Sequence, residues 1–187
     1  MVAERWDGAT ALVVVDVQQG FDDTAYWGAR NNPDCEANIA RLLEAWRDYG
    51  WPVVYVRHDS RDPHSPLAPG RPGNAFKEVL AGEPDLLVTK DVHSAFHGTP
   101  DLDGWLRRMD VSGVAVCGIQ TNVCCETTAR VACDLGYDVL FVVDATHTFD
   151  IVASNHKVYR AREVARYSAL TIDGEFGRVV YTDELVG

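Results

Sequence analysis

The sequence predicts an α/β protein in three layers, with a Rossmann-like, six-stranded and mainly parallel β-sheet between two layers of helices. Short apolar runs alternate along the chain with amphipathic stretches of helical period, and each run is apolar throughout. Strands of that kind are buried on both faces, as in a parallel sheet covered by helices on each side. With 187 residues, 47% of them hydrophobic, the chain can form one large core, so we expect a single domain over residues 1–187.

The amino-terminal half contains the first expected elements. Residues 11–15, Ala-Leu-Val-Val-Val, predict a buried strand. A helix is expected over residues 34–49, because apolar residues recur at helical spacing from Ile39 to Trp46 and Gly50 is suited to end it. The next two strands are expected at residues 52–56 and 86–89.

The long segment 57–85 between those two strands is rich in Pro, Gly, His and Arg. It predicts an irregular loop, which in a compact domain is usually functional or mobile. In the carboxyl-terminal half, helices are expected over residues 126–135, closed by Gly136, and over about 155–169. The remaining strands are expected at residues 114–117, 139–143 and 178–181.

Composition excludes several classes of partner. The net charge of −11 argues against binding to nucleic acid or to an anionic membrane surface. No apolar run has the length of a membrane span, and residues 1–10 lack the basic start and apolar core of a signal peptide. Five cysteines without CxxC spacing indicate free thiols and a cytoplasmic protein. They are Cys35, Cys117, Cys124, Cys125 and Cys133.

The segment most informative about function is Gly118-Ile-Gln-Thr-Asn-Val-Cys-Cys-Glu-Thr-Thr-Ala129. It places Cys124 where a buried strand is followed by a helix, with Thr121 and Asn122 as candidate caps. The helix dipole and unpaired backbone N–H groups at that point favour a thiolate and can hold an oxyanion. Cys124 is therefore the candidate nucleophile, and Cys125, about 100° further round the helix, should face the core or the sheet.

Asp16 and Lys90 also stand at the ends of expected strands, and carboxyl ends of parallel strands meet at one edge of a sheet. A carboxylate there can accept the thiol proton while an ammonium stabilises the thiolate. The chain has 14 Arg and only three Lys, which favours a specific role for Lys90. Taken singly, Asp16 could cap a turn, Lys90 could be a solvated charge and Cys124 could be a small buried residue.

Together these motifs resemble the isochorismatase-like cysteine hydrolase superfamily, which includes nicotinamidases, N-carbamoylsarcosine amidase, ureidoacrylate and biuret amidohydrolases and streptothricin hydrolase. The resemblance spans nearly the whole chain. The motifs that carry it are Asp16-x-Gln18-x-x-Phe21, Lys90 with Ser94-Ala-Phe-x-Gly-Thr99, Gly118-x-x-Thr121-Asn-x-Cys124, and Gly136-Tyr137 with Asp144-Ala145.

The resemblance implies a triad of Asp16 as general base, Lys90 as electrostatic partner and Cys124 as nucleophile. It also implies a cis peptide bond at Ile119–Gln120, and an oxyanion hole formed by the Gln120 and Cys124 N–H groups. The implied reaction is hydrolysis of an amide, ureide or lactam C–N bond in a small molecule through a thioester. A homodimer or homotetramer is implied as well.

No metal or other cofactor is expected. Nicotinamidases of this superfamily carry a metal site built around Asp-x-His, whereas the equivalent segment here offers His58, Asp59 and His64 in another arrangement. Nicotinamide, whose ring nitrogen would use that metal, is accordingly a less favoured substrate. The candidate substrate-binding residues follow the expected strands and are mostly aromatic. They are Phe21, Trp27, His58, Phe96 and His147.

Rival functions remain open at this stage. One is a catalytically idle binding or scaffold protein on the same fold, against which the complete triad counts. A vinyl-ether hydrolase of the isochorismatase type is disfavoured because that cleavage does not need the thiol. A thiol redox protein is disfavoured because Cys124 and Cys125 are adjacent and lack CxxC spacing. A dinucleotide-dependent reductase is disfavoured because no G-x-G-x-x-G follows the first strand.

Overall fold

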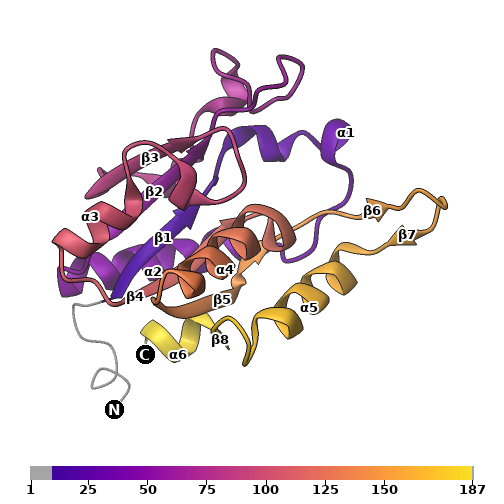
Figure 1. The fold of residues 1–187 in the computed structure, drawn as a ribbon. Coiled ribbons are helices and arrows are strands. Elements are labelled where there is room, and N and C mark those ends of the chain that lie inside the picture. The colour runs from indigo at the N-terminus through magenta and orange to yellow at the C-terminus, as the bar shows by residue number, and fades with distance from the viewer. Residues whose placement is uncertain (1–9, 187) are drawn as a thin grey trace.

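The central element is a six-stranded sheet in which every neighbouring pair of strands is parallel (Figure 1). A computed structural model describes residues 10–186; residues 1–9, in which no signal peptide is expected, lie outside them. The strand order is β3-β2-β1-β4-β5-β8, which confirms the predicted parallel sheet. The strands are β1 (Thr10–Val15), β2 (Val53–His58), β3 (Leu86–Lys90), β4 (Gly113–Ile119), β5 (Asp138–His147) and β8 (Arg178–Val180).

Helices cover both faces of this sheet, as the apolar strands require. They are α1 (Thr24–Trp27), α2 (Cys35–Tyr49), α3 (Leu102–Arg108), α4 (Glu126–Asp134), α5 (Ala161–Ile172) and α6 (Thr182–Val186). Helices α2 and α6 lie on one face, and α3, α4 and α5 lie on the other. None of the helices in the described part of the chain has both the length and the apolar character of a membrane span.

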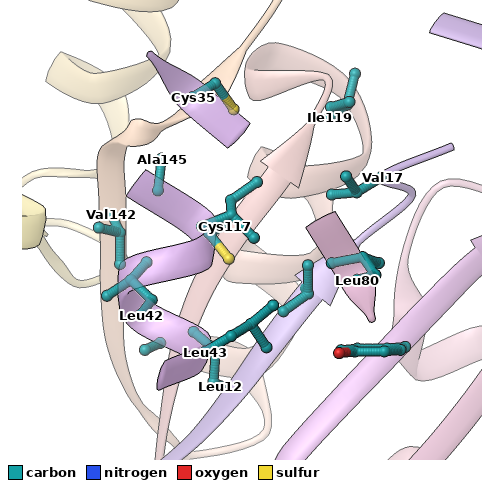
Figure 2. Packing of buried hydrophobic residues seen from close by; sticks show 14 of the residues in the cluster. Leu12, Val17, Cys35, Leu42, Leu43, Leu80, Cys117, Ile119, Val142 and Ala145 are labelled. Carbon is teal, nitrogen blue, oxygen red and sulfur yellow. The ribbon is translucent and has the colours of Figure 1, made fainter. Parts of the chain in front are cut away.

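Alternate residues of β1 supply the two halves of the core. Leu12 and Val14 face α2, whereas Ala11, Val13 and Val15 face α3 and α4, as the two-residue period of a strand dictates. Figure 2 shows the α2 side, where the leucines of that helix pack against side chains of the sheet. The hydrophobic contact on both faces explains why the sequence of β1 is apolar without alternation.

The predicted elements are confirmed to within a few residues, except for the start of the helix expected over about residues 155–169. It was expected at about residue 155, but α5 begins at Ala161. The preceding residues form an antiparallel hairpin of β6 (Ile151–Val152) and β7 (Val158–Tyr159). The carboxylate of Asp150 then accepts a hydrogen bond from the Ala161 N–H at the first turn of α5. That bond satisfies a free helix-terminal donor, so the helix starts after the hairpin.

The long loop after β2 is irregular, as expected, apart from two short 3₁₀ turns at Pro72–Asn74 and Glu78–Leu80. Its start is held by the buried side chain of Gln18, which accepts from the His58 N–H (2.8 Å) and donates to the carbonyl oxygens of His58 (3.0 Å) and Asn74 (2.9 Å). These bonds connect the end of β1 with the end of β2 and with the loop. The position of His58 is therefore well defined.

Strand order reverses between β1 and β4, which are neighbours in the sheet although β2 and β3 lie between them in the sequence. Such a switch point is where α/β proteins form their sites. Asp16 has a positive φ of 53°, which turns the chain out of β1. Gly118 in β4 has a φ of 122°, and a Cβ there would lie 2.0 Å from the Val15 carbonyl oxygen. Glycine is required at this position because the two backbones are in close contact.

Candidate active site

A buried ion pair joins the ends of β1 and β3. The Lys90 ammonium donates to the Asp16 carboxylate with an Nζ–Oδ2 distance of 2.6 Å, and both side chains are fully shielded from solvent. Burying two charges is costly, and it is tolerated only where partners and geometry compensate. The second oxygen, Asp16 Oδ1, is also buried and has no hydrogen-bond partner. An unpaired carboxylate oxygen of this kind is available to accept a proton.

Cys124 lies beside this pair. It belongs to a single wide helical turn, Thr121–Cys125, that follows β4 and leads into α4. The Cys124 sulfur, a carboxylate oxygen of Asp16 and a ring nitrogen of His58 all lie within 4.8 Å of one another. The side chain of Cys125 is fully buried on the α4 face, as predicted, so Cys124 is the thiol at the site.

The predicted caps at this helix start are wrong. Thr121 donates its hydroxyl to the Thr146 hydroxyl (2.9 Å), and Asn122 accepts from the Thr148 hydroxyl. Neither side chain caps the turn, because both are used to bind the end of β5. Their bonds fix the turn that carries Cys124 against the neighbouring strand.

Burial opposes the thiolate that the helix start was expected to favour. Burial, and then the Asp16 carboxylate, raise the pKa of the Cys124 thiol well above its usual value, and the opposing effect of Lys90 is smaller. Burial by itself would lower the pKa of Lys90, but Asp16 and Cys124 raise it. The surroundings of Cys124 in this site therefore favour the neutral thiol over the thiolate at rest. Its nucleophile has to be formed by proton transfer during the reaction.

The peptide bond between Ile119 and Gln120, directly before the turn, is cis. The Val123 and Cys125 N–H groups donate to the Gln120 carbonyl oxygen, which closes the turn. Gln120 and Cys124 are thus placed on one short segment beside the triad.

The sequence-predicted binding residues do not lie together in one place. His58 lies at the triad, with Nδ1 at 3.3 Å from Lys90 Nζ. Phe21 and Trp27 form an aromatic cluster with Phe149, and the Trp27 indole donates to the Gly20 carbonyl oxygen (2.8 Å). Phe96 is placed elsewhere: its ring stacks on Tyr137 and packs on the α3–α4 face.

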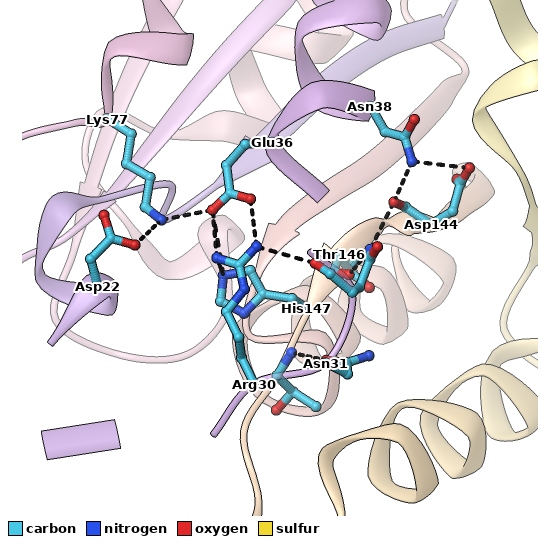
Figure 3. Close-up of polar contacts among 11 residues, drawn as sticks. Asp22, Arg30, Asn31, Glu36, Asn38, Lys77, Asp144, Thr146 and His147 are labelled. Carbon is cyan, nitrogen blue, oxygen red and sulfur yellow. Dashed lines mark hydrogen bonds and ion pairs between the residues drawn. The ribbon is translucent and has the colours of Figure 1, made fainter. Parts of the chain in front are cut away.

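His147 is fully buried within a polar cluster of Arg30, Glu36, Lys77 and Asp22 (Figure 3). Glu36 binds Arg30 at 2.6 Å and Lys77 at 2.7 Å. Burial, then Arg30, lowers the pKa of His147 to about 3. The sequence motifs did not indicate this cluster, because its members come from separate loops and helix ends. Gln18 belongs to the motif that begins at Asp16, but the sequence did not predict its role in holding the end of β2.

The histidine and carboxylate set considered for a metal is not assembled. The Asp59 carboxylate binds Arg57 and Asn74. Among the described residues, the group whose atoms could hold a metal ion is instead Asp16, His58 and Cys124. The Lys90 ammonium already contacts Asp16 and His58, so an ion there would have to displace it.

A groove of about 680 Å³ lies along α5 and the strands β5 and β8, and it is lined by residues such as Asp144, Arg166 and Tyr181. The triad residues are not among those that line it. A hollow of about 380 Å³ adjoins Lys90, lined by the chain after β2 and β3. Cys124 itself is only 7% exposed, so the site is nearly closed.

This parallel three-layer fold with its site at the strand ends is that of a hydrolase family. The chain belongs to the isochorismatase family: the family model described as Isochorismatase domain matches residues 10–171. Members of this family are hydrolases, amidohydrolases among them.

Relatives support this assignment. The chain is 38% identical to the uncharacterized isochorismatase family protein YrdC of Bacillus subtilis, over 94% of both chains. It is 33% identical to nicotinamidase 3 of Arabidopsis thaliana, covering 75% of this chain and 74% of that one. It is 32% identical to the ureidoacrylate amidohydrolase RutB of Methylobacterium radiotolerans, covering 74% and 67%.

Solved structures agree with the fold. A hydrolase of the isochorismatase family from Chromobacterium violaceum superimposes with a TM-score of 0.90 at 36% identity, covering 96% of this chain and 93% of that one. A cysteine hydrolase from Pseudomonas syringae pv. phaseolicola gives a TM-score of 0.86 at 34% identity, covering 97% and 92%. The isochorismatase-like hydrolase fold expected from the sequence is therefore confirmed.

Proposed function

We propose that the chain is a cysteine amidohydrolase that cleaves a C–N bond of a small amide, ureide or lactam through a thioester. The observation that carries this proposal is the buried Asp16–Lys90 pair beside the Cys124 thiol. A carboxylate with an unpaired buried oxygen, an ammonium and a thiol are the groups that acyl transfer to sulfur requires. The nearly closed site suits a small substrate.

In the first half-reaction, Asp16 takes the thiol proton as the Cys124 sulfur attacks the substrate carbonyl carbon. Lys90 stabilises the sulfur while it carries negative charge, and the N–H groups of Gln120 and Cys124 hold the oxyanion. The C–N bond then breaks, and Asp16 returns the proton to the leaving nitrogen. Ammonia or an amine departs and leaves a Cys124 thioester.

In the second half-reaction, Asp16 accepts a proton from a water molecule that attacks the thioester. The C–S bond breaks, the sulfur recovers a proton, and the carboxylic acid is released. Asp16 therefore alternates between base and acid. A high resting pKa of the thiol is compatible with this sequence, because the proton moves only while the substrate is bound.

Names of relatives favour C–N cleavage over the vinyl-ether alternative. Nicotinamidase 3 and ureidoacrylate amidohydrolase RutB are named for hydrolysis of an amide and of a ureide. Vinyl-ether cleavage does not need the thiol, whereas here the thiol is built into the site.

The test is release of ammonia or amine from a panel of amides, ureides and lactams, followed by mass spectrometry. Cys124→Ala is expected to reduce turnover to background with its circular dichroism unchanged. Cys125→Ala is the matched control, since it removes the adjacent thiol from the core, and it should keep most of the activity. Full activity in Cys124→Ala would contradict the proposal.

We also infer a homodimer or homotetramer. The β6–β7 hairpin exposes Ile151, Val152 and Val158, and a two-stranded hairpin is marginally stable without cover. Light scattering coupled to size exclusion should therefore give a mass of two or four chains. A monomeric mass at micromolar concentration would exclude this.

A further inference from the structure

His58 contacts the catalytic ammonium from a neighbouring strand. It is the last residue of β2, and it lies in register with Lys90, the last residue of β3. Its Nδ1 atom is 3.3 Å from Lys90 Nζ. Among the sequence-predicted binding residues, His58 has this direct contact with the triad.

The chemistry of the two groups defines the direction of this hydrogen bond. An ammonium has three N–H donors and no acceptor, so Nδ1 must accept and the ring proton must be on Nε2. The Asp16 carboxylate is a second acceptor of Lys90, and Cys124 lies near enough to raise the pKa of Lys90. Acceptors at the ends of β1 and β2 thus meet two of the three ammonium donors.

The backbone of His58 is held independently of its ring. Gln18 bonds both its N–H and its carbonyl oxygen, and the Asn74 amide donates to the same oxygen at 3.2 Å. Asn74 in turn binds Asp59 and Leu67. Because these hydrogen bonds hold the backbone of His58, its ring can fix the position of the Lys90 ammonium that it contacts.

We propose that His58 is a positioning residue, which accepts a hydrogen bond from Lys90 and thereby holds its ammonium toward Asp16 and Cys124. It acts through Lys90 and does not bind the substrate. This inference rests on the proposed function, since it takes Lys90 as the partner of the Cys124 nucleophile. It replaces the substrate-binding role that the sequence suggested for His58.

The proposal requires a neutral imidazole, and the surroundings of the ring favour one. Burial, and then Lys90, lower the pKa of His58, with Asp16 opposing them. The charged and titratable groups that face or influence it are Lys90, Asp16, Cys124, His93, Asp59 and Asp91.

The test compares His58→Asn with His58→Leu, two side chains of similar shape. Asn carries an acceptor oxygen close to the position of Nδ1, and Leu carries none. His64→Leu, which changes an exposed histidine in the loop that follows β2, is the control. The first readout is the rate at which iodoacetamide alkylates Cys124 between pH 5 and 9, measured by mass spectrometry on the folded full chain.

We expect His58→Leu to lower the alkylation rate by about 10- to 100-fold, the effect of leaving one buried donor unpaired. The alkylation rate of His58→Asn should stay within about threefold of the wild-type rate, because the Asn amide oxygen can still accept the hydrogen bond from Lys90. In the wild type the rate should also fall at acid pH as His58 gains a proton, and His58→Asn should lack that part of the fall. With a hydrolysed substrate, His58→Leu should lower kcat and leave KM unchanged.

Equal rates for His58→Leu and the wild type would overturn the proposal, and so would equal losses for Asn and Leu. A raised KM with unchanged kcat would assign His58 to substrate binding instead. If His58→Leu does not fold, His58→Gln replaces it. The amide of Gln lies one bond beyond the Nδ1 position, so this variant also lacks an acceptor at that point. If the alkylation rates follow this pattern but no substrate of the panel is hydrolysed, the positioning role of His58 stands and the amidohydrolase proposal fails.

Discussion

Asp16 and Lys90 depend on each other for stability as well as for chemistry. Asp16→Asn leaves an ammonium buried without its counter-ion, and Lys90→Met leaves a buried carboxylate in the same position. Removing one partner of a buried pair typically costs about 3–5 kcal/mol. A domain of this kind has about 5–15 kcal/mol in total, so either single variant should lose a large share of its stability.

The double variant Asp16→Asn/Lys90→Met removes both charges and should recover much of that loss. Replacing a buried ion pair by neutral groups of similar size is often close to neutral. We therefore expect a coupling energy of at least about 2 kcal/mol between the two sites. All three variants should lack turnover.

Urea unfolding followed by tryptophan fluorescence provides the assay, with buried Trp46 as a reporter in the core. The four proteins form a double-mutant cycle. If the free-energy losses of the two single variants simply add in the double variant, the ion pair does not contribute as argued. Activity in the stable double variant would contradict the roles given to both residues.

Other predictions concern parts of the fold around the site. The pKa of His147 is about 3 in the folded protein and about 6.5 when unfolded, so the unfolded state binds the proton first and stability is lost as pH falls from about 6.5 to about 3. This loss should be on the order of 5 kcal/mol, by about 1.4 kcal/mol per unit of pKa difference. Urea titrations at several pH values should show a flatter pH dependence of stability for His147→Gln, and an unchanged slope would disprove the assignment. Gly118→Ala should cost at least about 3 kcal/mol or prevent folding, because its Cβ meets the Val15 carbonyl oxygen. Gly50→Ala, also at positive φ but in open space, should cost only about 1–2 kcal/mol, and equal thermal shifts for the two would refute the steric argument.

The sheet and the triad positions could be predicted from sequence for one physical reason. Strands buried on both faces are apolar without interruption, so their ends are visible wherever a polar residue follows. Asp16, Lys90 and Cys124 all stand at such ends, and parallel topology brings those ends to one edge. The prediction needed no knowledge of strand order.

Features that depend on register and on loop paths could not be predicted in this way. The His58–Lys90 contact exists because β2 and β3 pair in one particular register, which apolar runs do not specify. The Arg30–Glu36–Lys77 cluster depends on three segments whose paths the sequence does not define. The resting protonation of Cys124 depends on burial, which a motif at a helix start does not reveal.

The near-complete enclosure of Cys124 has a consequence for covalent labelling of the protein. Because only 7% of the residue is exposed, the thiol should react readily with small electrophiles and poorly with large ones. Small neutral reagents such as iodoacetamide or acrylamide can reach the sulfur, whereas bulky anionic disulfides are opposed by both the narrow approach and the net charge of −11. Ellman's reagent should accordingly undercount the thiols of the folded chain, and inhibitors of this protein are best sought among compact, uncharged warheads.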